Sequence, residues 1–154
     1  VTDDLDMKLG GEFSYRLAVG GFLSAKQVFI PDYQHILGNQ TVLANDPLSG
    51  FQLAPYYRYS NTSKLFATAH VEYHLNGLLT NKIPGFKRLN WFLVTGANLL
   101  HTQKGKNYYE AFVGLENILK IMRVDFVKGF ETKGPSPTGI RITVPFFLES
   151  RNDD

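Results

Sequence analysis

The chain has 154 residues, with 16 Lys and Arg against 14 Asp and Glu, and it contains no cysteine. The near balance of charge argues against a nucleic-acid-binding protein, which usually carries a strong basic patch. The lack of cysteine excludes disulfides, thiol nucleophiles and cysteine-bound metals. Charged residues make up 19% of the chain and aromatic residues 14%, and the sequence has no apolar run long enough for a transmembrane helix.

Alternation of apolar and polar residues, which is typical of strands with two different faces, recurs along the chain. In chain order it predicts strands over residues 12–23, 51–60, 64–76, 88–100, 107–117, 120–130 and 139–147. A long loop is expected over residues 24–49. A helix competes with the strands over residues 115–122, where apolar residues fall at helical spacing, but the β-type composition that follows favours strands.

The length of these segments indicates the kind of β protein. Strands that span a membrane need about 9 to 11 residues, whereas strands of soluble proteins have about 5 to 6. We therefore expect an all-β fold, an antiparallel transmembrane β-barrel. Bacterial barrels have an even number of strands, from eight upward, so about seven strands predict a segment of a larger barrel. A soluble barrel with the apolar face inward, binding an apolar ligand, is the alternative.

The alternation also assigns side chains to the two sides of the expected barrel wall. Residues predicted to face lipid are Leu65, Val71, Tyr73, Val113, Leu115, Val124, Ile142 and Val144. Polar residues predicted to face the lumen are His70, Glu72, His74, Glu110, Glu116, Arg123, Asp125 and Arg141. Opposite charges on adjacent strands pair across a sheet, so we expect ion pairs among the lumen-facing residues.

Metal binding and catalysis are not predicted from these polar residues. His70, Glu72 and His74 lie in a line on one strand face, and three collinear side chains do not converge on one tetrahedral metal ion. A lipid hydrolase would need a Ser or Thr nucleophile beside a His base, and only proximity in the sequence places Ser60 or Thr68 near His70. We expect no catalytic residue, no metal and no cofactor.

The loop and three of the strand-bearing segments also carry a family resemblance. They read FIPDYQHILGNQT, FATAHVEYHLNGLLTNKIPGFKRLNWFLVTGANLL, NYYEAFVGLENILKIMRVDFVKGF and GIRITVPFF. Over about residues 13–147 the chain resembles the C-terminal β-barrel region of a Bacteroidota outer-membrane protein family of unknown function, whose members carry an N-terminal carboxypeptidase-regulatory-like domain. More distantly, it resembles the barrel superfamily of outer-membrane assembly factors and two-partner secretion transporters, with Glu72, Gly114 and Phe146-Phe147 in matching places.

The resemblance implies an outer-membrane location, a longer parent chain and a larger barrel, with about 16 strands as one candidate size. It implies no known activity. Two departures weaken the link to the assembly superfamily: residues LESRNDD follow Phe147, and the loop at 24–49 lacks the arginine of the superfamily's lumen motif.

The sequence therefore predicts a bacterial outer-membrane β-barrel protein with a structural, transport or assembly-associated role and no chemistry of its own. Its expected partners are membrane lipid and either other outer-membrane proteins or the rest of a larger barrel chain, with no nucleic acid among them. A lipid hydrolase and a soluble ligand-binding barrel are the alternatives. The side of the membrane on which the loop at 24–49 lies depends on whether residues 51–60 span the membrane or form an internal arm.

Overall fold

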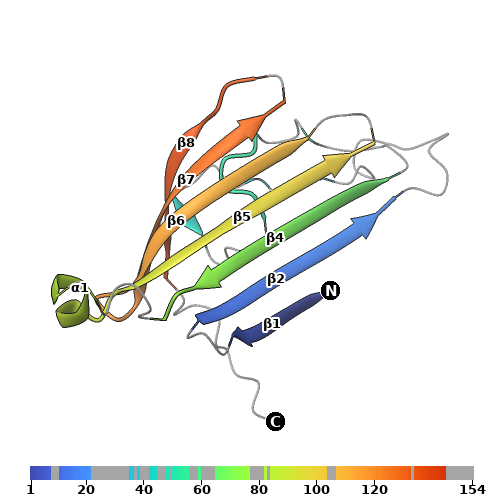
Figure 1. Cartoon of the computed structure of the whole chain (residues 1–154). Helices are drawn as coiled ribbons and strands as arrows, with labels where there is room; N and C mark the ends of the chain where they lie inside the picture. Colours follow the sequence, from blue (N-terminus) through green and yellow to red (C-terminus); the bar gives the residue numbers. More distant parts are fainter. Residues whose placement is uncertain are drawn as a thin grey trace, which may run out of the picture.

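The computed structural model describes residues 1–7, 11–21, 35–36, 38, 42–44, 48, 50–55, 59, 65–76, 82, 84–103, 107–132 and 134–144. Over these residues the chain forms an eight-stranded sheet and one short α-helix (Figure 1). The prediction of an all-β, antiparallel fold is confirmed.

The strands lie side by side in the order β1-β2-β4-β5-β6-β7-β8-β3. Every neighbouring pair is antiparallel except β3 and β8, which are parallel. The bounds are β1 Thr2–Met7, β2 Gly11–Gly20, β3 Leu43–Ala44, β4 Phe66–His74, β5 Phe92–Thr102, β6 Tyr108–Ile118, β7 Met122–Glu131 and β8 Thr138–Thr143. Two strands were not predicted: β1, because its TDDLDM sequence is rich in residues that disfavour strands, and β3, because it has only two residues.

The strand register collects residues of one kind into rows that run across the sheet. One row of paired positions contains Arg16, His70, Asn98 and Glu110. Successive residues of a strand point to opposite faces, so the adjacent row lies on the other face. That row contains Leu17, Ala69, Leu99, Tyr109 and Phe130. The alternation in the sequence thus becomes one polar and one apolar face.

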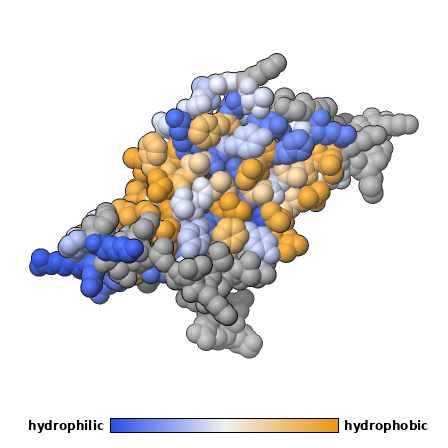
Figure 2. Space-filling view, in the orientation of Figure 1, coloured by the Kyte–Doolittle hydropathy of each residue, from blue (hydrophilic) through white to orange (hydrophobic). Residues whose placement is uncertain are grey.

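The burial of these two faces is the reverse of that in an ordinary soluble sheet. The polar face is covered, and among the described residues eleven polar or charged residues are buried against nine hydrophobic ones. On the other face, large apolar side chains are exposed, namely Leu17, Val19, Leu99, Tyr109, Val113, Phe126, Phe130 and Ile140. Figure 2 shows hydrophobic surface over much of the strands.

The polar face is covered by residues 50–55, which we call the strap. A strand was predicted over residues 51–60, and this prediction is wrong for the described residues 51–55 and 59, where Phe51 makes only an isolated bridge with Gly38. The backbone N–H groups of Gln52 and Leu53 donate to the side chain of Glu110 instead of to a neighbouring strand. Residues 56–58 and 60 lie outside the described residues.

The long segment between β2 and β4 begins and ends at the same end of the sheet, because β2 and β4 are antiparallel neighbours. We call it the loop end because the β5–β6 and β7–β8 loops join their strands there too (Figure 1). The β1–β2, β4–β5 and β6–β7 connections lie at the opposite end, the turn end. The loop expected at 24–49 belongs to the segment that joins these two strand ends, and only its residues 35–36, 38, 42–44 and 48 are described.

The helix α1, Pro84–Leu89, lies within the β4–β5 connection at the turn end. It replaces the beginning of the strand predicted over residues 88–100. Proline suits the first position of a helix because its φ is already helical, and Asn90 ends the helix with a φ of 56°, a conformation that Asn tolerates. No helix in the described part of the chain has both the length and the apolar character needed to cross a membrane.

The helix that competed over residues 115–122 is not formed, because β6 and β7 pair as a hairpin across this stretch. Over the described residues, the strands predicted at 12–23, 64–76, 107–117, 120–130 and 139–147 correspond to β2, β4, β6, β7 and β8, and the strand predicted at 88–100 overlaps β5. In this part of the chain the sheet does not close, because its two edge strands, β1 and β3, do not pair with each other.

Candidate functional site

The eight residues predicted to face the lumen lie together on the polar face. Six of them are buried, namely His70, Glu72, Glu110, Arg123, Asp125 and Arg141, while His74 and Glu116 are half-buried. Their strands, β4, β6, β7 and β8, span the centre of the sheet. The structure divides these residues into two hydrogen-bonded groups. That the polar face lines a lumen stays a prediction.

The first group is built on an ion pair between β4 and β7. Arg123 donates from its two terminal nitrogens to the two carboxylate oxygens of Glu72, at 2.5 and 2.8 Å. This bidentate geometry is the strongest arrangement available to Arg and a carboxylate. Because β5 and β6 lie between the two strands, the pair ties four strands together over the polar face.

Asp125 extends this group to β8. Its Oδ1 accepts a hydrogen bond from Nε of Arg123 at 2.8 Å, and its Oδ2 accepts one from Nε of Arg141 at 2.7 Å. Asp125 is fully buried and Arg141 is 1% exposed. Two carboxylates and two guanidinium groups thus neutralise one another, which is the condition under which buried charges are tolerated.

Two residues of β6, Gly114 and Phe112, lie against these charged side chains and fix their positions. A Cβ added at Gly114 would meet the carboxylate of Asp125, so this position must be glycine for the carboxylate to lie where it does. The ring of Phe112 lies 5.5 Å from the guanidinium of Arg123 and 4.5 Å from that of Arg141. Cations over an aromatic face are stabilised by its quadrupole, so Phe112 holds both guanidinium groups in place.

His74 continues the first group toward the turn end. Its Nε2 lies 2.7 Å from Oε1 of Glu72 and its Nδ1 lies 2.8 Å from Oε2 of Glu116. The resulting chain of contacts runs through Glu116, His74, Glu72, Arg123, Asp125 and Arg141. We call these six residues the ion ladder. Ion pairs among these residues were expected from the sequence, and the ladder has that form.

The second group is centred on Glu110, whose carboxylate accepts hydrogen bonds from four neutral donors. Its carboxylate accepts hydrogen bonds from the backbone N–H groups of Gln52 at 2.9 Å and Leu53 at 2.6 Å. It also accepts from Nδ2 of Asn98 at 3.2 Å and from the hydroxyl of Tyr108 at 2.8 Å. Glu110 is 1% exposed, so on folding these hydrogen bonds replace the water around its carboxylate. Two of them come from the strap and fix it on the sheet.

Asn98 links Glu110 to His70 and determines the histidine tautomer. Because Nδ2 of Asn98 donates to Glu110, its Oδ1 faces Nδ1 of His70, 3.0 Å away. An amide oxygen can only accept, so Nδ1 of His70 carries a proton. His70 therefore belongs to the Glu110 group, whereas His74 belongs to the ion ladder.

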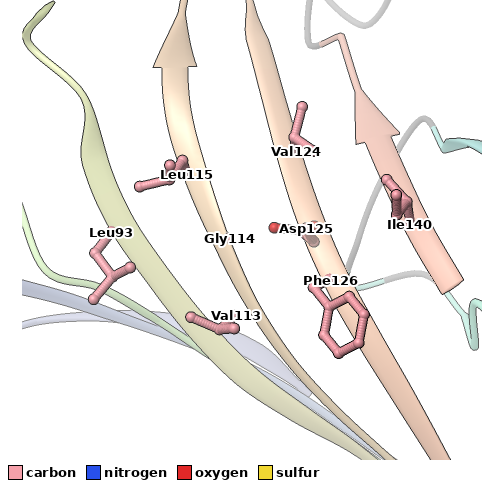
Figure 3. Close-up of a pocket in the computed structure, with 8 residues that line it drawn as sticks. All are labelled: Leu93, Val113, Gly114, Leu115, Val124, Asp125, Phe126 and Ile140. Atoms are coloured by element: carbon pink, nitrogen blue, oxygen red, sulfur yellow. The ribbon is translucent and has the colours of Figure 1, made fainter. Parts of the chain in front are cut away.

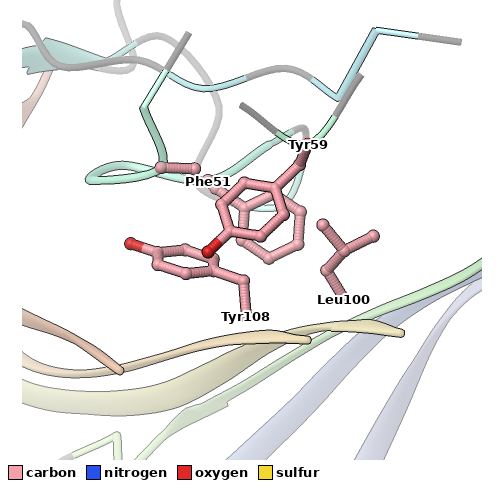
Figure 4. Packing of buried hydrophobic residues seen from close by; sticks show 5 residues of the cluster. Phe51, Tyr59, Leu100 and Tyr108 are labelled. Carbon is pink, nitrogen blue, oxygen red and sulfur yellow. The ribbon is translucent and has the colours of Figure 1, made fainter. Parts of the chain in front are cut away.

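Aromatic packing also fixes the strap on the sheet (Figure 4). Phe51 and Tyr59 both pack on Tyr108, with ring centroids 5.6 and 5.2 Å apart, and Phe51 lies 5.0 Å from the ring of His70. At the other end of the strap, a Cβ added at Gly139 of β8 would meet the side chain of Leu53. The strap thus reaches from β4 to β8 across the polar face.

The sequence did not point to the residues that hold the strap. Asn98, Tyr108 and the backbone of Gln52 and Leu53 were not among the predicted site residues. The one usable signal is that Tyr108, Glu110 and Asn98 fall at polar-face positions of the predicted strands. Gln52 and Leu53 lie 58 and 57 residues from Glu110 along the chain, a separation that no local pattern reveals.

The polar face shows no group of side chains arranged to bind a metal ion within the described residues. Of the two nucleophiles considered beside His70, Ser60 lies outside the described residues, and Thr68 is two residues away on the same strand. What the arrangement can do is join strands to one another and hold the strap.

The opposite face carries the residues predicted to face lipid. Leu65 and Val113 are about half exposed, at 50% and 46%, and the other six are half-buried among their neighbours. A shallow apolar hollow of about 300 Å³ opens on this face over β5 to β8 (Figure 3). Its walls are formed by Leu93, Val113, Leu115, Val124, Phe126 and Ile140, and the backbone at Gly114 and Asp125 forms its floor.

Comparison with models of known protein families gives a match over most of the chain. The model of the C-terminal domain of a family of unknown function, DUF5686, matches residues 1–115. No curated protein matches the chain, and no solved structure matches it either. The match covers β1 to most of β6, and so includes the strap, Glu72 and Glu110.

Proposed function

Because the chain belongs to the family defined by the DUF5686 C-terminal domain, whose function is unknown, we propose a role from the sheet itself: the chain forms part of the wall of a bacterial outer-membrane β-barrel. In this role its apolar face contacts lipid and its polar face lines the interior. The wall is structural, or serves transport or assembly, and carries out no chemistry of its own.

The observation that carries this proposal is the reversed burial of the two faces. Soluble monomers rarely expose a contiguous apolar patch larger than a few hundred Å², yet eight large apolar side chains are exposed here on one sheet face. Meanwhile five charged residues are buried on the other face. Lipid is the solvent that makes both favourable, since a transmembrane barrel alternates apolar residues outward with polar residues inward.

Strand length and the apolar hollow support the same orientation. Five strands, β2, β4, β5, β6 and β7, have 9 to 11 residues, which is the length that a tilted strand needs to cross the hydrocarbon layer. The hollow over β5 to β8 is lined almost entirely by apolar atoms, and a lipid acyl chain has the shape and polarity to fill it.

The open edges of the sheet support a larger barrel. In lipid every backbone polar group needs a partner, so a spanning sheet must close, and over the described residues this sheet does not. We propose that the remaining strands come from the rest of a longer parent chain. The resemblance stated above adds a Bacteroidota source and an N-terminal carboxypeptidase-regulatory-like domain to this proposal.

Neither alternative gains support from the site. A soluble barrel would turn the apolar face inward around its ligand, whereas here the apolar face is the exposed one. A lipid hydrolase needs a base that can reach substrate, whereas His70 is 4% exposed and lies against Phe51.

The proposal is tested by measuring the environment of the two faces. The chain has no cysteine, so single cysteines at Val113 and Ala18 give unique labelling sites, both exposed and on opposite faces. In lipid vesicles, a spin label at Val113 should be accessible to oxygen and shielded from a water-soluble relaxation agent. The label at Ala18 should show the opposite behaviour. Exposure to water at both positions would overturn the proposal.

A further inference from the structure

The turn end of the sheet brings together two segments that are far apart in the sequence. The side chain of Asn117, next to the β6–β7 turn, donates a hydrogen bond of 2.7 Å to the backbone oxygen of Asn90, the residue that follows α1. The helix and the turn therefore lie side by side at the tip of the sheet (Figure 1). We call the exposed residues of this region the basic tip. They are Lys87, Arg88, Leu89, Leu119, Lys120 and Ile121.

The basic tip combines positive charge with exposed apolar side chains. It has three cations, and no Asp or Glu occurs in residues 77–91 or 117–122. Leu89, Leu119 and Ile121 are 54%, 77% and 47% exposed. Figure 2 shows the hydrophilic surface at α1 adjoining the hydrophobic surface of the strands. Anionic partners would meet cations and apolar groups here at the same time.

Among the residues whose side chains are described, the acidic ones at the turn end do not offset this charge. Glu116 lies on the polar face, where His74 contacts its carboxylate. Glu12 is exposed but belongs to β2, which β4 and β5 separate from β6. The basic tip therefore keeps its positive charge toward the outside of the sheet.

The β6–β7 turn displays two of these residues in a backbone conformation that they disfavour. The N–H of Ile121 donates to the backbone oxygen of Ile118 at 3.2 Å, and Leu119 and Lys120 between them have φ angles of 52° and 68°. A two-residue hairpin turn with both φ positive favours Asn-Gly. Leucine and lysine at these positions strain the turn, and such strain persists typically where the residues serve a function.

We propose that the basic tip is a docking surface for anionic lipid headgroups. The cations would contact the phosphates, and Leu89 and Leu119 would insert between the headgroups, as amphipathic surfaces do at a membrane interface. The inference rests on the proposed function, since the tip stands at the end of the face that would contact the acyl chains. A lipid surface fits better than a nucleic acid because apolar side chains are interleaved with the cations.

The test uses the 154-residue chain and two kinds of vesicle, phosphatidylcholine alone and an equal mixture with phosphatidylglycerol. Association should be stronger with the mixed vesicles and should weaken as salt is added. A juxtamembrane cation contributes enough attraction to change the association constant about fivefold. The variant Lys87→Gln/Arg88→Gln should therefore lose the preference for anionic vesicles by about one order of magnitude or more.

A variant of the turn separates a docking role from a structural one. Leu119→Asn/Lys120→Gly installs the sequence that the turn geometry favours, so it should raise the melting temperature while it weakens association with anionic vesicles. The control Ser136→Glu changes net charge by the same amount at the exposed loop end, and it should leave association unchanged.

The outcomes also distinguish this inference from the proposed function. If the label at Val113 reports hydrocarbon but the tip variants bind anionic vesicles as the unaltered chain does, the docking surface is wrong and the barrel wall stands. If Val113 reports water while the tip variants still lose binding, the tip docks from outside and the barrel wall is wrong. Competition by heparin without any preference for anionic vesicles would assign the tip to a polyanion and overturn the inference.

Discussion

Arg123 on β7 clamps both carboxylate oxygens of Glu72 on β4, at 2.5 and 2.8 Å, with two strands lying between their backbones. Both side chains are buried, at 7% and 4% exposure. A contact across two intervening strands fixes the curvature of the sheet as well as its pairing, because the side chains can meet only if the strands are held at one distance.

Removing one partner of this pair should lower the free energy of unfolding more than removing both. Arg123→Met leaves the buried Glu72 with His74 as its remaining partner, and a broken buried pair costs about 3 to 5 kcal/mol. The double variant Glu72→Met/Arg123→Met removes the uncompensated charge and should be closer to the unaltered chain. Unfolding free energies from urea titrations of the four chains give the coupling energy. Additive losses would show that the pair contributes nothing as a pair.

Gly114 should not tolerate a methyl group. In Gly114→Ala the new Cβ meets the carboxylate of Asp125, and such overpacking costs typically about 1 to 3 kcal/mol. The matched control is Gly85→Ala in α1, where an added Cβ meets no atom within 4 Å and alanine favours the helix. Thermal unfolding should show a lower melting temperature for the first variant and an equal or higher one for the second.

Glu110 should act as the anchor of the strap. Glu110→Gln keeps the shape but replaces one acceptor oxygen with a donor, which then opposes the N–H of Gln52 or Leu53. We expect the strap to detach, so that a cysteine placed at Ala54, which is 1% exposed in the structure, becomes reactive to a thiol reagent. Glu116→Gln, which affects only the turn end of the ion ladder, is the control and should leave the cysteine protected.

A charge on the apolar face should destabilise the protein in lipid, and more strongly the deeper it lies in the hydrocarbon layer. Val113→Arg places a cation in the middle of β6, and arginine at the midplane of a barrel's lipid face costs about 2 to 4 kcal/mol. Ser136→Arg, on the exposed loop end, should be nearly neutral. Unfolding measured in lipid vesicles compares the two variants. Equal effects would argue against a lipid-facing Val113.

The strands could be read from the sequence wherever one local pattern decides the structure. The alternation in residues 64–76 assigned His70, Glu72 and His74 to one face, and the structure places all three on the polar face. Arg123, Asp125 and Arg141 were assigned in the same way. Period-two alternation depends only on neighbouring residues, so it predicts the face of each side chain correctly wherever the segment forms a strand.

The strap could not be predicted, because its conformation depends on a distant side chain. Phe51 and Leu53 alternate with Gln52 as in a strand. However, the backbone N–H groups of Gln52 and Leu53 donate to Glu110 and not to the backbone of a neighbouring strand. The helix α1 was missed for a different reason. With six residues it is too short to show helical periodicity, although Pro84 and Asn90 mark its two ends.

The acidic composition of β1 has a consequence for association between copies. As the last strand of the sheet, β1 leaves one side of its backbone without a neighbour in the described structure, and an unpaired edge can pair with the edge of another molecule. Asp3, Asp4 and Asp6 make up half of this strand. Two copies of this strand would together carry six aspartates, so charge repulsion should oppose pairing between copies at this edge and favour a strand that carries positive charge.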